Sequence, residues 1–220
     1  MNRLRYYFLE PMSTLTHLVG VAVSLVGLAV LVWLTRDERP KMLSLLVYGL
    51  SQVVLYTASS LLHGVKLPEE RRMWLNRLDH AAIFLLIAGT YTPIIHAFMP
   101  KMWRPEVLTA VWLVALAGVV YKLSSRRIHG FLNTSIYLLL SWGGAVPLVL
   151  AFNVAPNVTA GGFALLLLGG LIYSLGYVVY YLRRPDPWPN VFGHHELWHL
   201  FVLGGGLSHF LFMLLYVVPA

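Results

Sequence analysis

The sequence predicts an all-α membrane protein, a bundle of seven transmembrane helices. Its composition indicates this class, because 58% of the 220 residues are apolar and only 11% are charged, whereas soluble domains carry about 25% charged residues. The placement of the charges indicates it too, because Asp, Glu, Lys and Arg lie at the ends of long apolar stretches or between them. We therefore expect one membrane-embedded domain over residues 1–220.

Seven stretches reach or approach the roughly 20 apolar residues that cross the hydrocarbon core of a bilayer. The fourth is short, and we expect Lys122 to extend it by reaching toward the interface. Pro93 and Pro147 fall inside the third and fifth stretches, where we expect kinks. The predicted spans, in chain order, are Met12–Leu34, Met42–Leu62, His80–Met99, Val107–Tyr121, Phe131–Phe152, Gly162–Leu182 and Leu197–Val218.

The loops predict the orientation of these spans. The segments before span one and between spans two and three, four and five, and six and seven hold 11 Lys and Arg, against 5 on the other side. Positive residues concentrate on the cytoplasmic side of membrane proteins, so we expect the N-terminus inside and the C-terminus outside.

These loops also explain the net charge of +7, and we expect no nucleic-acid partner. The chain has no Cys, which excludes disulfides and thiol chemistry.

The last span begins with His195-Glu196-Leu197-Trp198-His199, which matches the pattern H-E-x-x-H. This spacing places two histidines one helical turn apart, where both can bind one zinc, and zinc proteases use the glutamate as a general base. Glu196 has a second interpretation, because the helix dipole favours a carboxylate near a helix N-terminus. A single histidine near a membrane interface is more often structural, so the pattern alone leaves both interpretations open.

The topology brings further polar residues to the same membrane face. Span two runs inward and ends at His63, span three starts inside next to Asp79, and span seven starts inside near His195 and His199. Three histidines are a ligand set with which zinc keeps an open position for water, and Asp79 could bind or orient that water. We therefore predict a metal site near the cytoplasmic face.

Three short motifs carry a resemblance to a known family. They are Ser59-Ser60-Leu61-Leu62-His63, Asp79 within "RLDHAAIFLLIAGTYTP", and the H-x-x-x-H pattern of span seven, accompanied by "THLVG" at residues 16–20 and "FVLGGGLSHF" at residues 201–210. In these motifs, their order and their spans, the whole chain resembles the hemolysin III family of bacterial membrane proteins. It is similar, more distantly, to the progestin and adipoQ receptors, which include the adiponectin receptors, and to the alkaline ceramidases.

The resemblance implies a seven-helix fold with a zinc ion near the cytoplasmic face, held by His63, His195 and His199. It implies that Asp79 holds the water at the metal and that Ser59 lies beside it, although Ser59 could instead bond back to its own helix. By analogy with the ceramidases it implies hydrolysis of lipid amides or esters, in a multi-pass protein of the bacterial inner (cytoplasmic) membrane. Asp79 is then a better candidate than Glu196 for acting on the water.

Several functions remain open at this point. The first is a zinc-dependent intramembrane hydrolase, with membrane lipids as partners and a lipid or fatty-acyl ligand. The second is a receptor or regulator of membrane lipid state, in which the zinc is structural. The third, a pore-forming hemolysin, ranks below them because the spans show almost no polar stripe, and a zinc protease is disfavoured by the choice of Asp79. The roles of His17 and His209, both in spans, and the oligomeric state stay undecided.

Overall fold

Seven long helices dominate the computed structural model, which describes residues 2–125, 131–152, 159–189 and 191–220. A short helix, α1 (Asn2–Tyr7), precedes them, the 3-10 turn Lys101–Trp103 lies before α5, and the π-helical turn Met213–Val217 follows α8. The long helices are α2 (Pro11–Leu34), α3 (Arg39–Gly64), α4 (Glu69–Phe98), α5 (Arg104–Ser124), α6 (Phe131–Phe152), α7 (Ala160–Leu182) and α8 (His194–Phe212).

The predicted fold class, an all-α bundle of seven helices, is confirmed. Six of the helices are long and apolar enough to cross a membrane, and α6 adds a 22-residue helix, predominantly apolar, whose bounds coincide with the predicted fifth span. Pro93 lies inside α4, and α6 runs past Pro147. The side chain of Pro147 lies outside the described residues, and the kinks expected at both prolines stay a prediction.

The start of α4 differs from the prediction. The helix begins at Glu69, well before His80, where the third span was expected to start. Two acidic residues, Glu69 and Glu70, occupy its first turn, where the positive end of the helix dipole favours them. As a consequence, Asp79 lies nearly three turns inside the helix and not at its beginning.

The expectation that Lys122 reaches toward the interface is wrong. Lys122 is fully buried, with 0% of its surface exposed. Its ammonium lies 5.7 Å from the ring centre of Tyr121 and 5.1 Å from that of Tyr137. The attraction between a cation and the face of an aromatic ring favours this buried position. The fourth span reaches its length instead because α5 begins at Arg104 and continues to Ser124.

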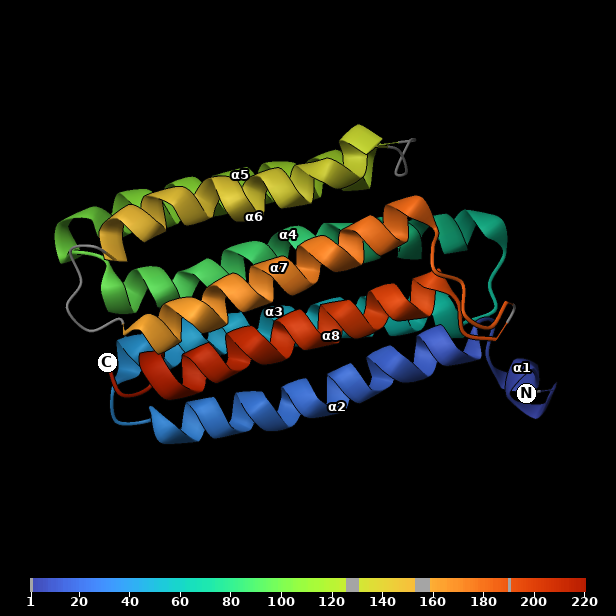
Figure 1. Ribbon diagram of the computed structural model, residues 1–220, viewed down its shortest axis with the longest axis horizontal. Helices are drawn as coiled ribbons and strands as arrows, with labels where there is room; N and C mark the ends of the chain where they lie inside the picture. Colours follow the sequence, from blue (N-terminus) through green and yellow to red (C-terminus); the bar gives the residue numbers. More distant parts are fainter. Residues whose placement is uncertain (1, 126–130, 153–158, 190) are drawn as a thin grey trace.

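The long helices lie side by side along one axis of the molecule (Figure 1). The pair α5 and α6 forms one side, α2 lies on the opposite side, and α3, α4, α7 and α8 lie between them. The two ends of the chain are at opposite ends of the bundle. The N-terminal end therefore gathers α1, the beginnings of α2, α4 and α8, and the end of α3.

The two ends of the bundle differ in character. At the end away from α1, a cluster of fully buried apolar side chains fills the centre, and it includes Leu31, Leu45, Phe212 and Val217. Lys41 closes this end, because its ammonium donates to the carboxylate of Glu38 at 2.9 Å and to the backbone carbonyl of residue 218 at 3.2 Å. At the N-terminal end, by contrast, buried histidines, serines and threonines replace much of the apolar packing.

A row of glycines brings α7 against α8. The buried residues of α7 are Gly162, Gly169 and Gly176, spaced seven residues apart and therefore on one helix face. The ring of His209 and the side chain of Phe201, both on α8, pack directly over Gly169 and Gly176. Small residues let membrane helices approach closely, and van der Waals contact then holds them together.

A methyl group at position 176 should disrupt this contact. A Cβ atom built at Gly176 would lie 2.4 Å from the Cβ of Phe201, which cannot rotate away, so Gly176→Ala should destabilise the fold by about 1–3 kcal/mol. Gly143→Ala is the matched control, because its Cβ would meet nothing within 4 Å. Thermal unfolding in detergent should show a lower Tm for the first variant only. Equal Tm values for the two would contradict the glycine contact.

Candidate metal centre

The structure brings His63, His195 and His199 together at the N-terminal end of the bundle. One ring nitrogen from each lies within 4.8 Å of the others. His63 is one residue from the end of α3, and the other two occupy the first turns of α8. His63 and His199 are buried and His195 is partly so. This is the convergence that the topology predicted.

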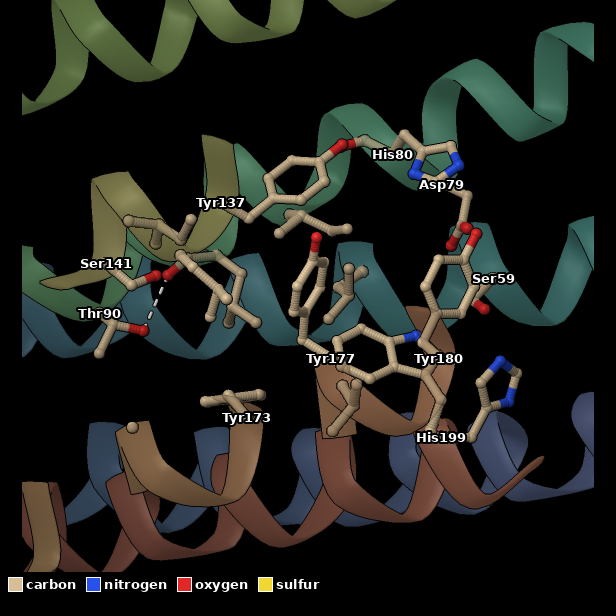
Figure 2. A pocket seen from close by; sticks show the side chains of 18 of the residues that line it. Ser59, Asp79, His80, Thr90, Tyr137, Ser141, Tyr173, Tyr177, Tyr180 and His199 are labelled. Atoms are coloured by element: carbon tan, nitrogen blue, oxygen red, sulfur yellow. Dashed lines mark hydrogen bonds between the residues drawn. The ribbon is translucent and has the colours of Figure 1, made fainter. Parts of the chain in front are cut away.

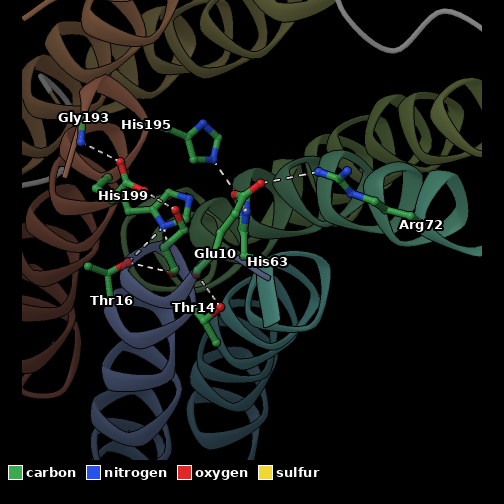
Figure 3. A network of polar contacts seen from close by, with 10 residues as sticks. Glu10, Thr14, Thr16, His63, Arg72, Gly193, His195 and His199 are labelled. Carbon is green, nitrogen blue, oxygen red and sulfur yellow. Dashed lines mark hydrogen bonds and ion pairs between the residues drawn. The ribbon is translucent and has the colours of Figure 1, made fainter. Parts of the chain in front are cut away.

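Hydrogen bonds fix which nitrogen two of these rings present to the centre of the group (Figure 3). Nδ1 of His63 lies 2.6 Å from Oε2 of Glu10, and Nδ1 of His199 lies 3.2 Å from the carbonyl oxygen of Ser13 and 3.0 Å from Oγ1 of Thr16. A carboxylate and a carbonyl only accept hydrogen bonds, so both Nδ1 atoms carry the proton. Each neutral ring then offers the lone pair of its Nε2 as a ligand.

Two of the three histidines have the spacing of zinc ligands. Nε2 of His63 lies 3.2 Å from Nε2 of His195, close to the separation of about 3.3 Å that two ligands have when each is about 2.0–2.1 Å from a tetrahedral zinc. The ligand atoms of all three histidines lie within 4.8 Å of one another, a wider spacing than a zinc-bound set has. Metal-binding histidines typically donate their other ring N–H to a carboxylate or a backbone carbonyl, as His63 and His199 do here. The 3.2 Å separation also suits a direct hydrogen bond from His195, so the geometry permits a metal without requiring one.

Glu10 belongs to this site, although the sequence analysis missed it. It lies directly before α2 and outside every predicted span. One carboxylate oxygen bonds to His63, and the other lies 3.4 Å from Nη2 of Arg72. The hydrogen bond to His63 lowers the pKa of Glu10 below its usual range. The one signal in the sequence was an acidic residue at the edge of span one, on the same side as the histidines.

Glu196 does not point at the histidine group. Its Oε1 accepts a hydrogen bond of 2.6 Å from the Ser13 hydroxyl, and its Oε2 accepts one of 2.8 Å from the backbone N–H of Gly193. The carboxylate therefore holds the first turn of α8 and ties it to α2. These contacts are those of a carboxylate at a helix N-terminus, the second interpretation of the residue.

Ser59 and Asp79 lie beside the histidines without joining them as ligands. Both line the cavity that the three histidines also line, and Figure 2 shows the two side chains next to each other. Asp79 also interacts electrostatically with His63. Among the described residues the metal-ligand group contains the histidines alone, so Asp79 lines the same cavity without being one of the grouped ligands.

His17 packs against the site from α2. Its ring stacks on that of His199 with the centres 3.7 Å apart and the planes at 11°, and within the described residues neither of its nitrogens has a hydrogen-bond partner. Among the described residues His17 is not part of the metal-ligand group, because the in-plane lone pairs of two stacked, parallel rings point along separate planes and not at one point. His209 lies farther along α8, with Nε2 3.4 Å from the carbonyl oxygen of Leu166.

A cavity of about 960 Å³ leads from the histidines into the interior of the bundle (Figure 2). Its size is at the upper end of the range for small-molecule sites, which is about 300–1,000 Å³. Residues from α3, α4, α6, α7 and α8 line it. Beyond the histidines its walls are largely apolar and aromatic, with Leu55, Ile83, Leu86, Ile94, Leu166 and Tyr173 among them.

Comparison with known proteins gives matches over nearly the whole chain. A family model described as "Haemolysin-III related" matches residues 6–210. Hemolysin-3 of Bacillus cereus is 33% identical over 224 residues, which cover 100% of this chain and 97% of that protein. The Hemolysin-3 homolog of Bacillus subtilis (strain 168) is 32% identical over 211 residues, or 95% and 94% of the two chains. With the apolar helices, these relatives identify a multi-pass integral protein of the bacterial cytoplasmic membrane.

A more distant match comes from an animal receptor. The adiponectin receptor protein of Drosophila melanogaster is 24% identical over 148 residues, which cover 61% of this chain and 33% of the receptor. The resemblance to adiponectin receptors inferred from the three motifs is thereby confirmed.

The two contacts of Glu196 predict a stability effect. Glu196→Ala removes acceptors from Ser13 and Gly193 and should cost about 1–2 kcal/mol, the usual range for a lost helix cap. Thermal unfolding in a chelator should show it, because the role does not depend on a metal. Glu106→Ala, an exposed acidic residue in the first turn of α5, should leave the Tm nearly unchanged. The interpretation fails if the Glu196 variant melts like the Glu106 variant.

Proposed function

The chain belongs to the haemolysin-III-related family, and from this premise we propose that it is a zinc-dependent hydrolase that cleaves amide or ester bonds of membrane lipids. His63, His195 and His199 are the proposed zinc ligands. The observation that carries the proposal is the direct opening of the histidine group into a large apolar cavity. Through this connection a substrate in the cavity can reach the histidines.

The chain's own residues have distinct tasks in this proposal. A zinc ion bound by the histidines would polarise a carbonyl group and make a water molecule nucleophilic near neutral pH. Asp79, on α4, lines the same cavity from a different helix than the histidines, and in this proposal it accepts a proton from the attacking water. It then returns the proton to the leaving amine or alcohol. Ser59 lies beside Asp79 and orients its carboxylate.

The walls of the cavity suggest the substrate class. Between the histidine group and Leu166 the lining is dominated by aliphatic and aromatic side chains such as Leu86 and Ile94. An acyl chain can fill this volume while its carbonyl carbon remains at the histidine end. This assigns the lipid or fatty-acyl ligand to the cavity and the scissile bond to the space between Asp79 and the histidines.

A receptor or regulator with a structural zinc is the second candidate. The match to an adiponectin receptor favours it, because the same cavity could hold a lipid without cleaving it. Pore formation, suggested by the name of the Bacillus relatives, ranks last. A pore through the centre of the bundle would have to cross the buried cluster around Leu31, Leu45 and Phe212.

Zinc content tests the ligand set. The purified protein should carry about one zinc per chain, and His63→Ala, His195→Ala and His199→Ala should each sharply reduce it in elemental analysis. His96→Ala is the control, because His96 lies in the last turn of α4 at the opposite end of the bundle. Full zinc content in all three variants would eliminate the site.

Lipid turnover separates hydrolysis from the alternatives. Asp79→Ala should retain most of the zinc and lower the release of fatty acid from bacterial lipids by at least about 100-fold, the size of a general-base contribution. Glu196→Gln should stay nearly as active as the unaltered protein, since Glu196 faces Ser13 and Gly193. Mass spectrometry of released fatty acids measures both.

The opposite result, an inactive Glu196 variant and an active Asp79 variant, would favour protease-like chemistry. If neither substitution changes the measured lipids while zinc is present, the zinc is structural and the receptor or regulator takes first place.

A further inference from the structure

We propose that Glu10 is a positioning residue of the metal centre, and that its carboxylate, through His63, sets the affinity of the site for its metal. The inference rests on the metal site of the proposed function and not on lipid hydrolysis. Three kinds of observation carry it: the contacts between Glu10 and His63, the balance of charge in the cavity, and the position of Glu10 between two cavities.

Glu10 contacts His63 at two points. Its backbone N–H donates to the backbone carbonyl of His63 at 2.9 Å, while its carboxylate accepts from Nδ1 of the same residue at 2.6 Å. The neighbouring N–H of Leu9 donates to the carbonyl of Gly64 at 3.2 Å. Backbone and side chain of one residue thus hold the main chain and the ring of the other. This fixes both the direction of the His63 ring and the location of its proton, which leaves Nε2 as the ligand atom.

The negative charge of Glu10 is a second reason to assign it a role at the metal site. Three neutral imidazoles bring no negative charge to a divalent cation, and a cation inside a membrane protein needs compensating groups. In the described part of the chain, two carboxylates, Glu10 and Asp79, and two arginines, Arg72 and Arg183, line the large cavity. One oxygen of Glu10 pairs with Arg72, and the other contacts the proposed ligand His63. A carboxylate bonded to the far nitrogen of a metal-binding histidine raises the basicity of the ligand atom.

Glu10 also stands between two cavities. A smaller cavity of about 580 Å³, next to the segment before α8, shares Glu10, His194 and His195 with the large one. Lys66 and Asp186 give its wall a more polar character. Lys66 also donates to the backbone carbonyl of Tyr6 at 3.0 Å, so the segment before Glu10 is fastened as well. The carboxylate is therefore held at the boundary of the metal site and does not swing freely.

The test is zinc affinity, measured by competition with a chromophoric chelator. Glu10→Gln preserves the size of the side chain and an acceptor for Nδ1 of His63 but removes the charge, and it should weaken zinc binding by about 10–100-fold. Glu10→Asp keeps the charge but shortens the side chain by one methylene. Its zinc affinity should therefore lie between those of the Glu10→Gln variant and the unaltered protein. Glu70→Gln is the matched control, an exposed carboxylate at the start of α4, and should bind zinc like the unaltered protein.

Thermal unfolding with and without zinc distinguishes positioning from a general structural role. The metal-free Glu10→Gln protein should melt close to the metal-free unaltered protein, while the rise in Tm on adding zinc should be smaller, because ligand stabilisation follows affinity. Unchanged zinc affinity in this variant overturns the inference. A large drop of Tm in the metal-free variant also overturns it, since that would make the role structural. If the unaltered protein takes up no zinc, the metal centre itself is wrong and this inference with it.

Discussion

A polar side chain in the interior of a bilayer must find its partner within the protein, and this constraint organises the whole histidine end of the bundle. The first turns of α2 supply most of the partners. The hydroxyl of Ser13 donates to Glu196, and its backbone carbonyl lies against Nδ1 of His199. The hydroxyl of Thr16 contacts the same nitrogen of His199, and the carboxylate of Glu10 accepts from His63. Hydrogen bonds therefore join three helices that are distant in sequence, α2, α3 and α8, at this point.

Much of this organisation follows from patterns that a sequence displays openly. Long apolar stretches define the helices, and the alternating directions of the helices bring the end of α3 and the beginning of α8 to one side. The proximity of His63 to His195 and His199 could therefore be predicted. Side-chain directions at helix ends could not be predicted in this way. Lys122 turned toward Tyr137 because a buried aromatic face was within reach, a contact between α5 and α6 that no local pattern reveals.

The motif H-E-x-x-H illustrates the same limit. Its spacing guarantees that two imidazoles lie one turn apart, and nothing in it decides where the glutamate points. At the start of a helix the unpaired backbone N–H groups compete for a carboxylate, and here Gly193 and Ser13 hold both oxygens of Glu196. Glu10 was overlooked for a related reason. Its importance comes from a partner 53 positions away, and its own surroundings in the sequence contain no pattern of metal binding.

Glu10, His194 and His195 line both cavities, of which the smaller has the more polar wall. These residues therefore separate a largely apolar environment from a more polar one. Under the proposed hydrolysis, the acyl fragment would remain in the apolar cavity while the polar fragment could leave through the smaller one. Separation of the two fragments would then oppose re-formation of the bond.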